Sequence, residues 1–309
     1  MHSWLCNAAG FGWFFAAAQP VIDPPDAPRF FAAESILVYV GLGIALAWLI
    51  WWIARSRRDP LALAPLREHK FRFETVLVVM CAYLVTATVL LGVAHLFAGD
   101  PTSSEGGDPS GEVIAPAITG LADALAKMAT VGVCLVLVSQ QFHGGIGRFL
   151  LGRRRVISDV AVGVLVAVAA TALCQWIGHF SELAVRSIAP DYVFEQHETI
   201  KALRRGDQSM ATVWLLRLGA VLVAPIAEEL FFRGLLQTML VRVVRSRWGA
   251  VAITSFAFAA VHALPHHWPA LIVLSMLMGA AYERTGSLIT PITIHMIFNG
   301  NTLFWDSLR

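Results

Sequence analysis

Two adjacent carboxylates and an arginine interrupt an apolar stretch in the last third of the sequence. In APIAEELFFRGLL, Glu228, Glu229 and Arg233 stand between the apolar segments TVWLLRLGAVLVAPIA and LLQTMLV. Ionisable side chains within such a segment are costly to bury, and by default they mark a functional site. Glu229 and Arg233 are four residues apart and can pair along one helix. Glu228 then points about 100° away round the same helix.

Two further polar motifs follow on later apolar segments. One is Phe258-x-x-x-His262 in FAFAAVHAL, and the other is His295-x-x-x-Asn299 in ITIHMIFNG. A spacing of four residues places His295 and Asn299 on one helix face, about one turn apart. At a rise of about 1.5 Å per residue, the three motifs lie about 18 to 26 Å from one shared end of their helices. The sequence therefore predicts that three helices bring polar side chains to a similar buried level.

These residue types could together carry out a hydrolysis. A carboxylate in a low-dielectric site gains basicity and can act as a general base toward water. One histidine can position that water or relay its proton. A second histidine and an asparagine can donate hydrogen bonds to the oxyanion of a tetrahedral intermediate. These groups suffice to hydrolyse an amide without a covalent enzyme intermediate.

Each motif also has a purely structural interpretation. A Glu–Arg pair in a membrane helix can be a neutralised strut, and Asn299 can form a hydrogen bond between helices. A lone histidine in an apolar helix is more often a hydrogen-bonded packing residue. A functional role is favoured because a spare carboxylate, two histidines and an amide occur together on consecutive apolar segments. Each of these groups needs a partner when it is buried.

The other histidines are assigned structural roles. His266 and His267, in LPHHWP, are expected to lie in a solvated loop. Packing roles near the ends of apolar segments are expected for His95, His143 and His179.

The composition of the chain predicts which kind of secondary-structure element positions the motifs. Of the 309 residues, 57% are hydrophobic and 14% charged, and the mean hydropathy is +0.66. A soluble protein of this length needs far more charge to cover its surface, and apolar runs of membrane-spanning length recur along the chain. We therefore predict an all-α fold, a polytopic transmembrane helical bundle. Its spans, about eight, are expected near 35–54, 75–98, 119–141, 157–180, 209–227, 249–264, 269–283 and 288–304.

The chain divides into three predicted parts. These are an N-terminal extension, 1–34, a set of N-terminal transmembrane helices, 35–208, and a transmembrane core, 209–309, that carries the motifs. The start of the chain lacks a Lys/Arg region before its apolar stretch, which argues against a cleaved signal peptide. The four cysteines show no paired or metal-ligand spacing and are predicted to be unpaired.

One helix of the core poses a length problem. A helix running straight from Met210 to Arg245 would be longer than the bilayer is thick. We expect either that Pro225 kinks or breaks it, or that its end projects from the membrane.

Basic residues in the loops predict the orientation. The segment from Arg55 to Arg72 is rich in arginine, whereas the next loop, GDPTSSEGGDPSGE, has no Lys or Arg. Basic residues return at 148–155 and at 242–247. Because positive charge is retained in the cytoplasm, these three basic loops are assigned to that side and both termini to the other. The site is then expected to open toward the cytoplasm, beside Arg242, Arg245 and Arg247.

The three motifs, in this order, resemble those of the CPBP family. These are intramembrane glutamic endopeptidases that include type II CAAX prenyl proteases and bacteriocin-processing proteins. The resemblance covers residues about 220–300 and rests on EE-x-x-x-R, F-x-x-x-H and H-x-x-x-N, with no departure from any of them. Each motif is weak alone, and three in order on apolar helices are fairly specific. The first 200 residues carry no such match.

The resemblance implies a role for each motif residue. Glu228 would activate the water, with His262 helping to hold it, and His295 and Asn299 would form the oxyanion site. Glu229 and Arg233 would orient the first motif, and Phe258 would line the site wall. The family implies a metal-independent protease with no cofactor and no nucleic-acid partner. Its substrate would be a protein or peptide, with a lipidated protein and CAAX-type C-terminal processing among the options.

Two other classes of function remain open. A zinc protease could draw ligands from Glu228, Glu229, His262 and His295, although the chain has no His-Glu-x-x-His helix and only QHETI in a loop. A membrane scaffold or proton-coupled transporter could use the same buried ionisable residues. Transporters often consist of two inverted halves, and residues 1–200 hold no corresponding motif.

Overall fold

The computed structural model describes residues 73–98, 109–142, 145–152, 156–194, 196–204, 208–262 and 264–307. These residues form helices and connecting turns and contain no strand, so the predicted all-α fold is confirmed. The predicted extension 1–34 and the span 35–54 lie outside the described residues. So do His143 and the side chain of His95.

Four stretches among the described residues are long and apolar enough to cross a membrane, judged by length and composition. They are Phe73–Val93, Ala117–Gln141, Gly145–Ile188 and Met210–Val244. They overlap the second to fifth predicted spans. The last three predicted spans correspond to shorter or less apolar helices, so the number eight stays a prediction.

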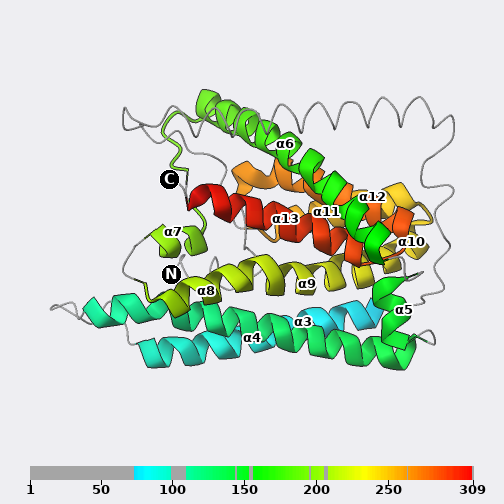
Figure 1. Cartoon of the computed structure of the whole chain (residues 1–309), viewed down its shortest axis with the longest axis horizontal. Coiled ribbons are helices and arrows are strands. Elements are labelled where there is room, and N and C mark those ends of the chain that lie inside the picture. Colours follow the sequence, from blue (N-terminus) through cyan, green and yellow to red (C-terminus); the bar gives the residue numbers. More distant parts are fainter. Residues whose placement is uncertain are drawn as a thin grey trace.

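The N-terminal half of the described chain consists of long helices and two short ones. The long helices α3 (Phe73–Ala98) and α4 (Pro109–Gln141) pack side by side, and α6 (Val156–Ile188) packs on the C-terminal helices. Short helices α5 (Gly145–Leu151) and α7 (Glu198–Arg204) lie in the connections. Figure 1 shows α3 and α4 along one side of the bundle and α6 crossing the other side.

A single continuous helical stretch runs through the middle of the bundle. It comprises α8 (Met210–Leu218), the π-helix η1 (Gly219–Val223), α9 (Ala224–Glu229), the π-helix η2 (Leu230–Gln237) and α10 (Thr238–Val244). The Ser209 hydroxyl accepts the backbone N–H of Thr212 and caps its start. Its end is marked by Arg245, whose φ of 56° stops the helix.

Three more helical elements complete the described chain. They are α11 (Arg247–Ala260), α12 (Trp268–Thr285) and α13 (Ile289–Asp306), with a 3-10 turn, η3 (Pro265–His267), between the first two. The central stretch contacts α4 on one side and α13 and α11 on the other. Figure 1 shows it between the α3–α4 pair and α13. Residues of α9 are therefore enclosed by helices distant in sequence.

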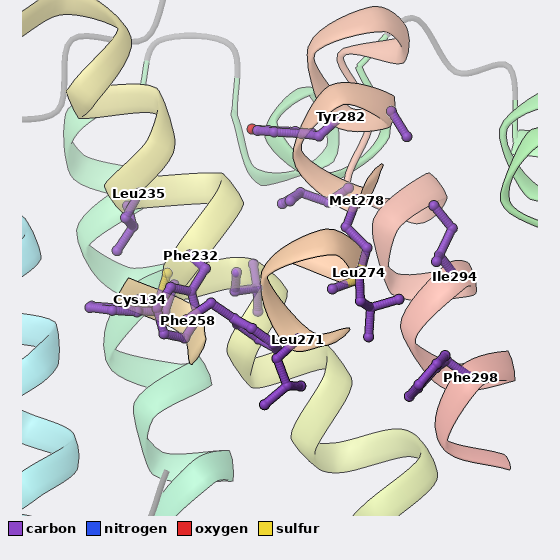
Figure 2. Packing of buried hydrophobic residues seen from close by; sticks show 14 of the residues in the cluster. Cys134, Phe232, Leu235, Phe258, Leu271, Leu274, Met278, Tyr282, Ile294 and Phe298 are labelled. Carbon is purple, nitrogen blue, oxygen red and sulfur yellow. The ribbon is translucent and has the colours of Figure 1, made fainter. Parts of the chain in front are cut away.

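Aromatic and aliphatic side chains fill the space around the central stretch. Figure 2 shows Cys134 of α4, Phe232 of η2 and Phe258 of α11 close together, with Leu271 and Leu274 of α12 beyond them. All five side chains are almost fully buried. Close helix packing is also visible between α6 and α13, because a Cβ at Gly163 would come within 2.7 Å of Thr293 Cβ.

The central helix accommodates Pro225 by a π-helical turn rather than by a break. Pro225 has no backbone N–H, and its ring conflicts with the regular α-helical carbonyl four residues earlier. The turn before it widens instead, and the Ala224 N–H donates to the carbonyl of Gly219, five residues back. The chain stays helical through Pro225, so the expected break is wrong. Projection of the helix end from the membrane stays a prediction.

Candidate active site

Arg233 and Glu229 form a buried ion pair at the centre of the bundle, and both are 0% exposed. The guanidinium donates to Glu229 Oε1 at 2.8 Å. Its other terminal nitrogen donates to Ser275 on α12, to Oγ at 2.7 Å and to the backbone oxygen at 3.2 Å. The Phe258 ring lies against it, with Cζ 4.9 Å from the ring centroid. Arg233 therefore fixes the Glu229 carboxylate and neutralises its charge within the same helical stretch, as the i,i+4 spacing predicts.

His295 of α13 lies between the two glutamates. Its Nδ1 is 2.9 Å from Glu229 Oε1, and its Nε2 is 3.9 Å from Glu228 Oε2. Because an ionised carboxylate only accepts hydrogen bonds, Nδ1 carries a hydrogen and Nε2 faces Glu228. Glu229 therefore fixes the orientation of the ring that reaches Glu228.

His262 lies just beyond the end of α11, with its ring fixed by its own backbone. Its Nδ1 is 2.6 Å from the carbonyl oxygen of Phe258. A carbonyl cannot donate, so Nδ1 carries the hydrogen, and Nε2 of the neutral ring has a free lone pair. The Phe258 ring packs against both catalytic-candidate histidines, with centroids 4.7 Å from His262 and 5.8 Å from His295. Phe258 therefore contacts both histidines, and its role as a wall of the site stays a prediction.

Asn299 is oriented by the π-helical turn before Pro225. Its Nδ2 donates to the carbonyl of Ala220 at 3.2 Å. The regular α-helical donor to that carbonyl, the Ala224 N–H, is bonded to Gly219 instead, and the π-helical donor, Pro225, has no N–H. Pro225 and the widened turn thus leave the Ala220 carbonyl oxygen without a backbone donor, so it can accept the hydrogen bond that orients the Asn299 amide. The second Nδ2 hydrogen of Asn299 is not used by this bond.

Four of the buried side-chain atoms without a hydrogen-bond partner among the described residues belong to Glu228, His262 and Asn299, and these four share one chemical character. Glu228 is 1% exposed, and both of its carboxylate oxygens are in this group, together with His262 Nε2 and Asn299 Oδ1. With Nδ1 of His262 protonated, all four are acceptors. Buried acceptors without donors are unfavourable, and water, with two O–H donors, is the simplest ligand that suits them. The arrangement is chemically suited to hold a water against Glu228.

The structure adds three polar residues that the sequence analysis missed. Lys127 and Asp123 of α4 form an ion pair at 2.5 Å, and Lys127 is 2% exposed. Tyr83 of α3 is hydrogen-bonded to Asp123. Helix α4, which carries the pair, packs on α9, which carries Glu228. The available signal was the i,i+4 Asp–Lys spacing inside an apolar run, the same signal that singled out Glu229 and Arg233.

The connection before α7 carries a further histidine, His197. Burial, followed by the charges of His262, Lys127 and Lys201, lowers the pKa of His197 in this connection to about 3. His197 is therefore neutral at physiological pH, and its Nδ1 accepts the backbone N–H of Thr199.

Three histidine predictions need correction or restriction. His266 and His267 are buried, not solvated, because Tyr192 and Phe194 pack on the His266 ring and its backbone oxygen accepts the Ser181 hydroxyl. His179 is exposed on α6, and its ring contacts that of its neighbour Phe180, so the predicted packing role is restricted to this contact. Among the described residues, no group of three or more His, Cys, Asp or Glu side chains could hold a metal ion.

Comparison with known proteins identifies the segment that carries the site. Residues 210–300 match the family model described as Type II CAAX prenyl endopeptidase Rce1-like. No curated protein and no solved structure matches the chain. The matched segment runs from the start of α8 into α13 and includes all three motifs, so the predicted family resemblance is confirmed. The match supports a CAAX-type intramembrane protease in general, acting on a protein or peptide.

Proposed function

We propose that this chain, whose residues 210–300 belong to the type II CAAX prenyl endopeptidase family, is an intramembrane endopeptidase that hydrolyses peptide bonds with water activated by Glu228. One observation carries the proposal. Both oxygens of Glu228 are buried without a hydrogen-bond partner among the described residues, whereas Glu229 is held by Arg233 and His295. Of the two adjacent glutamates, Glu228 is the one with both oxygens unpartnered, whereas one oxygen of Glu229 is bonded to Arg233 and His295.

The proposed reaction uses each group in the protonation state that its contacts favour. A water forms one hydrogen bond to Glu228 and another to His262 Nε2. Its oxygen attacks the carbonyl carbon of the scissile bond. Glu228 takes the proton as the new C–O bond forms. The second Nδ2 hydrogen of Asn299, which is not bonded to Ala220, forms a hydrogen bond to the developing oxyanion. When the C–N bond breaks, the proton passes from Glu228 to the leaving amine.

His295 has a dual role in this scheme. Its Nδ1–H is anchored on Glu229, so its Nε2 is directed at Glu228 and the space beside it. From there the neutral ring relays the proton between Glu228 and the leaving amine, and once protonated it carries a hydrogen on Nε2 that can support the oxyanion. Glu229 and Arg233 act through His295 and through the shape of the wall rather than on the substrate.

Cleavage of a lipidated peptide should be detectable and independent of zinc. We expect purified protein in liposomes to cleave a fluorogenic farnesylated peptide that ends in Cys-aliphatic-aliphatic-X. Rates with and without 1,10-phenanthroline should agree within twofold, because the scheme uses only side chains and water. The same peptide without the farnesyl group tests whether the lipid is required. Mass spectrometry of membrane proteins, with and without this chain, would extend the search to unlipidated substrates.

Two outcomes would redirect the proposal. Activity that chelation removes and added zinc restores would favour the zinc-dependent alternative. Liposomes that show no cleavage but carry protons across the membrane would favour the transporter alternative.

Access from the cytoplasm is proposed on the basis of the basic turn between α10 and α11. Arg242 and Arg245 are exposed there, at the end of the helical stretch that carries Glu228. In a background lacking the four native cysteines, Arg245→Cys should react with a membrane-impermeant maleimide only when the cytoplasmic face is open to the reagent. Labelling confined to the opposite face would reverse both the orientation and the direction of substrate access.

A further inference from the structure

His262 is the one motif residue that lies beyond the end of its helix. Helix α11 ends at Ala260, whereas the other motif residues lie within α9, η2, α11 and α13. The His262 N–H still donates to the carbonyl of Ala259 at 3.0 Å. The carbonyl of His262, however, is past the last helical turn, where no N–H of the helix can reach it. Its main chain is therefore fixed on one side only, unless a donor comes from elsewhere.

The first residue of α12 supplies that donor. The indole Nε1 of Trp268 donates to the carbonyl oxygen of His262 at 3.0 Å. This bond spans the turn between α11 and α12 and ties the main chain on its two sides. The His262 ring is fixed separately, because its Nδ1 donates to the carbonyl of Phe258. The N–H, the ring and the carbonyl of His262 are thus each held by a different residue.

The position of Trp268 is set by helix α6. Helix α6 packs on both η3 and α12, the two elements that meet at Trp268. The Ser181 hydroxyl of α6 donates to the carbonyl of His266 at 2.7 Å. The rings of Tyr192 and Phe194, just after α6, pack on the His266 ring. The donor that reaches His262 is therefore anchored on a helix other than the one that carries Phe258.

We propose that Trp268 is a positioning residue of the active site, whose indole N–H holds the main chain of His262 so that its Nε2 stays directed at the water beside Glu228. This inference rests on the proposed function, which assigns His262 to that water. Trp268 touches neither the water nor the substrate in this scheme and acts only through His262. Reactions that depend on exact placement are sensitive to such contacts, because a misplacement of about 1 Å can lower a rate about 10²-fold.

Trp268→Phe removes the N–H donor and keeps an aromatic ring. The kcat for the farnesylated peptide should fall about tenfold, less than the cost of a full 1 Å misplacement, because the His262 ring keeps its bond to Phe258. KM should stay within about twofold, because Trp268 makes no contact with the substrate in this scheme. Trp305→Phe is the matched control. It removes an indole bond to Asn301 Oδ1 at 3.1 Å, and it should keep kcat within about twofold of wild type.

A carbonyl chemical shift reports the bond without any substrate. His262 and Ala263 form the only His-Ala pair in the sequence. Carbonyl-labelled histidine combined with nitrogen-labelled alanine therefore gives one assigned NMR signal, that of the His262 carbonyl carbon. The signal should move upfield in Trp268→Phe, since the carbonyl loses its donor, and stay in place in Trp305→Phe. A tryptophan analogue at position 268 with sulfur in place of the indole N–H keeps the shape of the ring. It should reproduce both effects, and it replaces Trp268→Phe if that variant does not fold.

The two measurements separate this inference from the proposed function. A carbonyl signal that moves while kcat stays at the wild-type value would make the bond purely structural and overturn the positioning role. An unmoved signal would mean that Trp268 does not bond His262, and it overturns the inference as well. Where wild type cleaves through Glu228, both of these results leave the proposed function intact. If wild type cleaves no peptide, the proposed function is wrong and the role of Trp268 falls with it, whatever the signal does.

Discussion

Glu228→Gln is expected to lower kcat for peptide cleavage by about 10²–10⁴-fold, the usual contribution of a general base. Glutamine keeps the shape of the side chain and removes its basicity. Because no described residue donates a hydrogen bond to Glu228, the substitution breaks no existing bond, and the protein should remain folded. Turnover of the farnesylated peptide and the thermal unfolding midpoint in detergent measure the two expectations separately.

A second buried glutamate provides a matched control for this substitution. Glu283 is 2% exposed on α12 and accepts a hydrogen bond from Gln237 at 2.7 Å. Glutamine at position 283 can still accept that bond through its carbonyl oxygen. Glu283→Gln should therefore keep near-normal turnover. Near-normal turnover in Glu228→Gln, with Glu283→Gln also active, would show that Glu228 is not the base.

The motif residues were within reach of sequence reasoning because helix geometry is local. A spacing of four residues is enough to predict that Glu229 meets Arg233 and that His295 and Asn299 share a face. The structure places His295 on Glu229 and places Phe258 against His262 and His295. A buried polar group requires partners, so isolated polar residues on separate apolar helices could be predicted to contact one another.

The contribution of α4 could not be predicted in the same way. Asp123 and Lys127 have a helical spacing that predicts their own pairing, but nothing in the spacing tells which helix they face. That depends on how α4 packs against α9, a contact between residues about a hundred positions apart. The same limit explains His266 and His267. Their proline-flanked turn resembles a loop, and only the packing of Tyr192 and Phe194 buries it.

Pro225 illustrates a different limit of sequence reasoning. Proline within a helix predicts a kink or an end, but a π-helical turn accommodates it at the expense of one carbonyl. That carbonyl, on Ala220, then accepts Asn299 from another helix. The apparent defect in the helix is thus coupled to the placement of a site residue, which fits the frequent occurrence of π-helical turns at functional sites.

Arg233→Met is expected to destabilise the protein by about 3–5 kcal/mol and to eliminate cleavage. Methionine is an apolar side chain of similar length to arginine, but it leaves Glu229 buried without its cation. Removing one partner of a buried ion pair has a cost of this size. It also frees Ser275 on α12 and removes the contact with Phe258. The free energy of unfolding, from denaturant titration in detergent, is the measurement.

Two companion variants separate charge from packing. Arg217→Met lies on the same continuous helical stretch but is only half-buried, so it should change stability by no more than about 0.5 kcal/mol. Arg233→Met with Glu229→Gln removes both buried charges and should recover most of the lost stability, because no uncompensated charge remains. Cleavage should stay absent in that double variant, since His295 loses the ionised carboxylate that orients it toward Glu228. Recovery of both stability and cleavage would mean that the Glu229–Arg233 pair is a structural strut with no part in positioning His295.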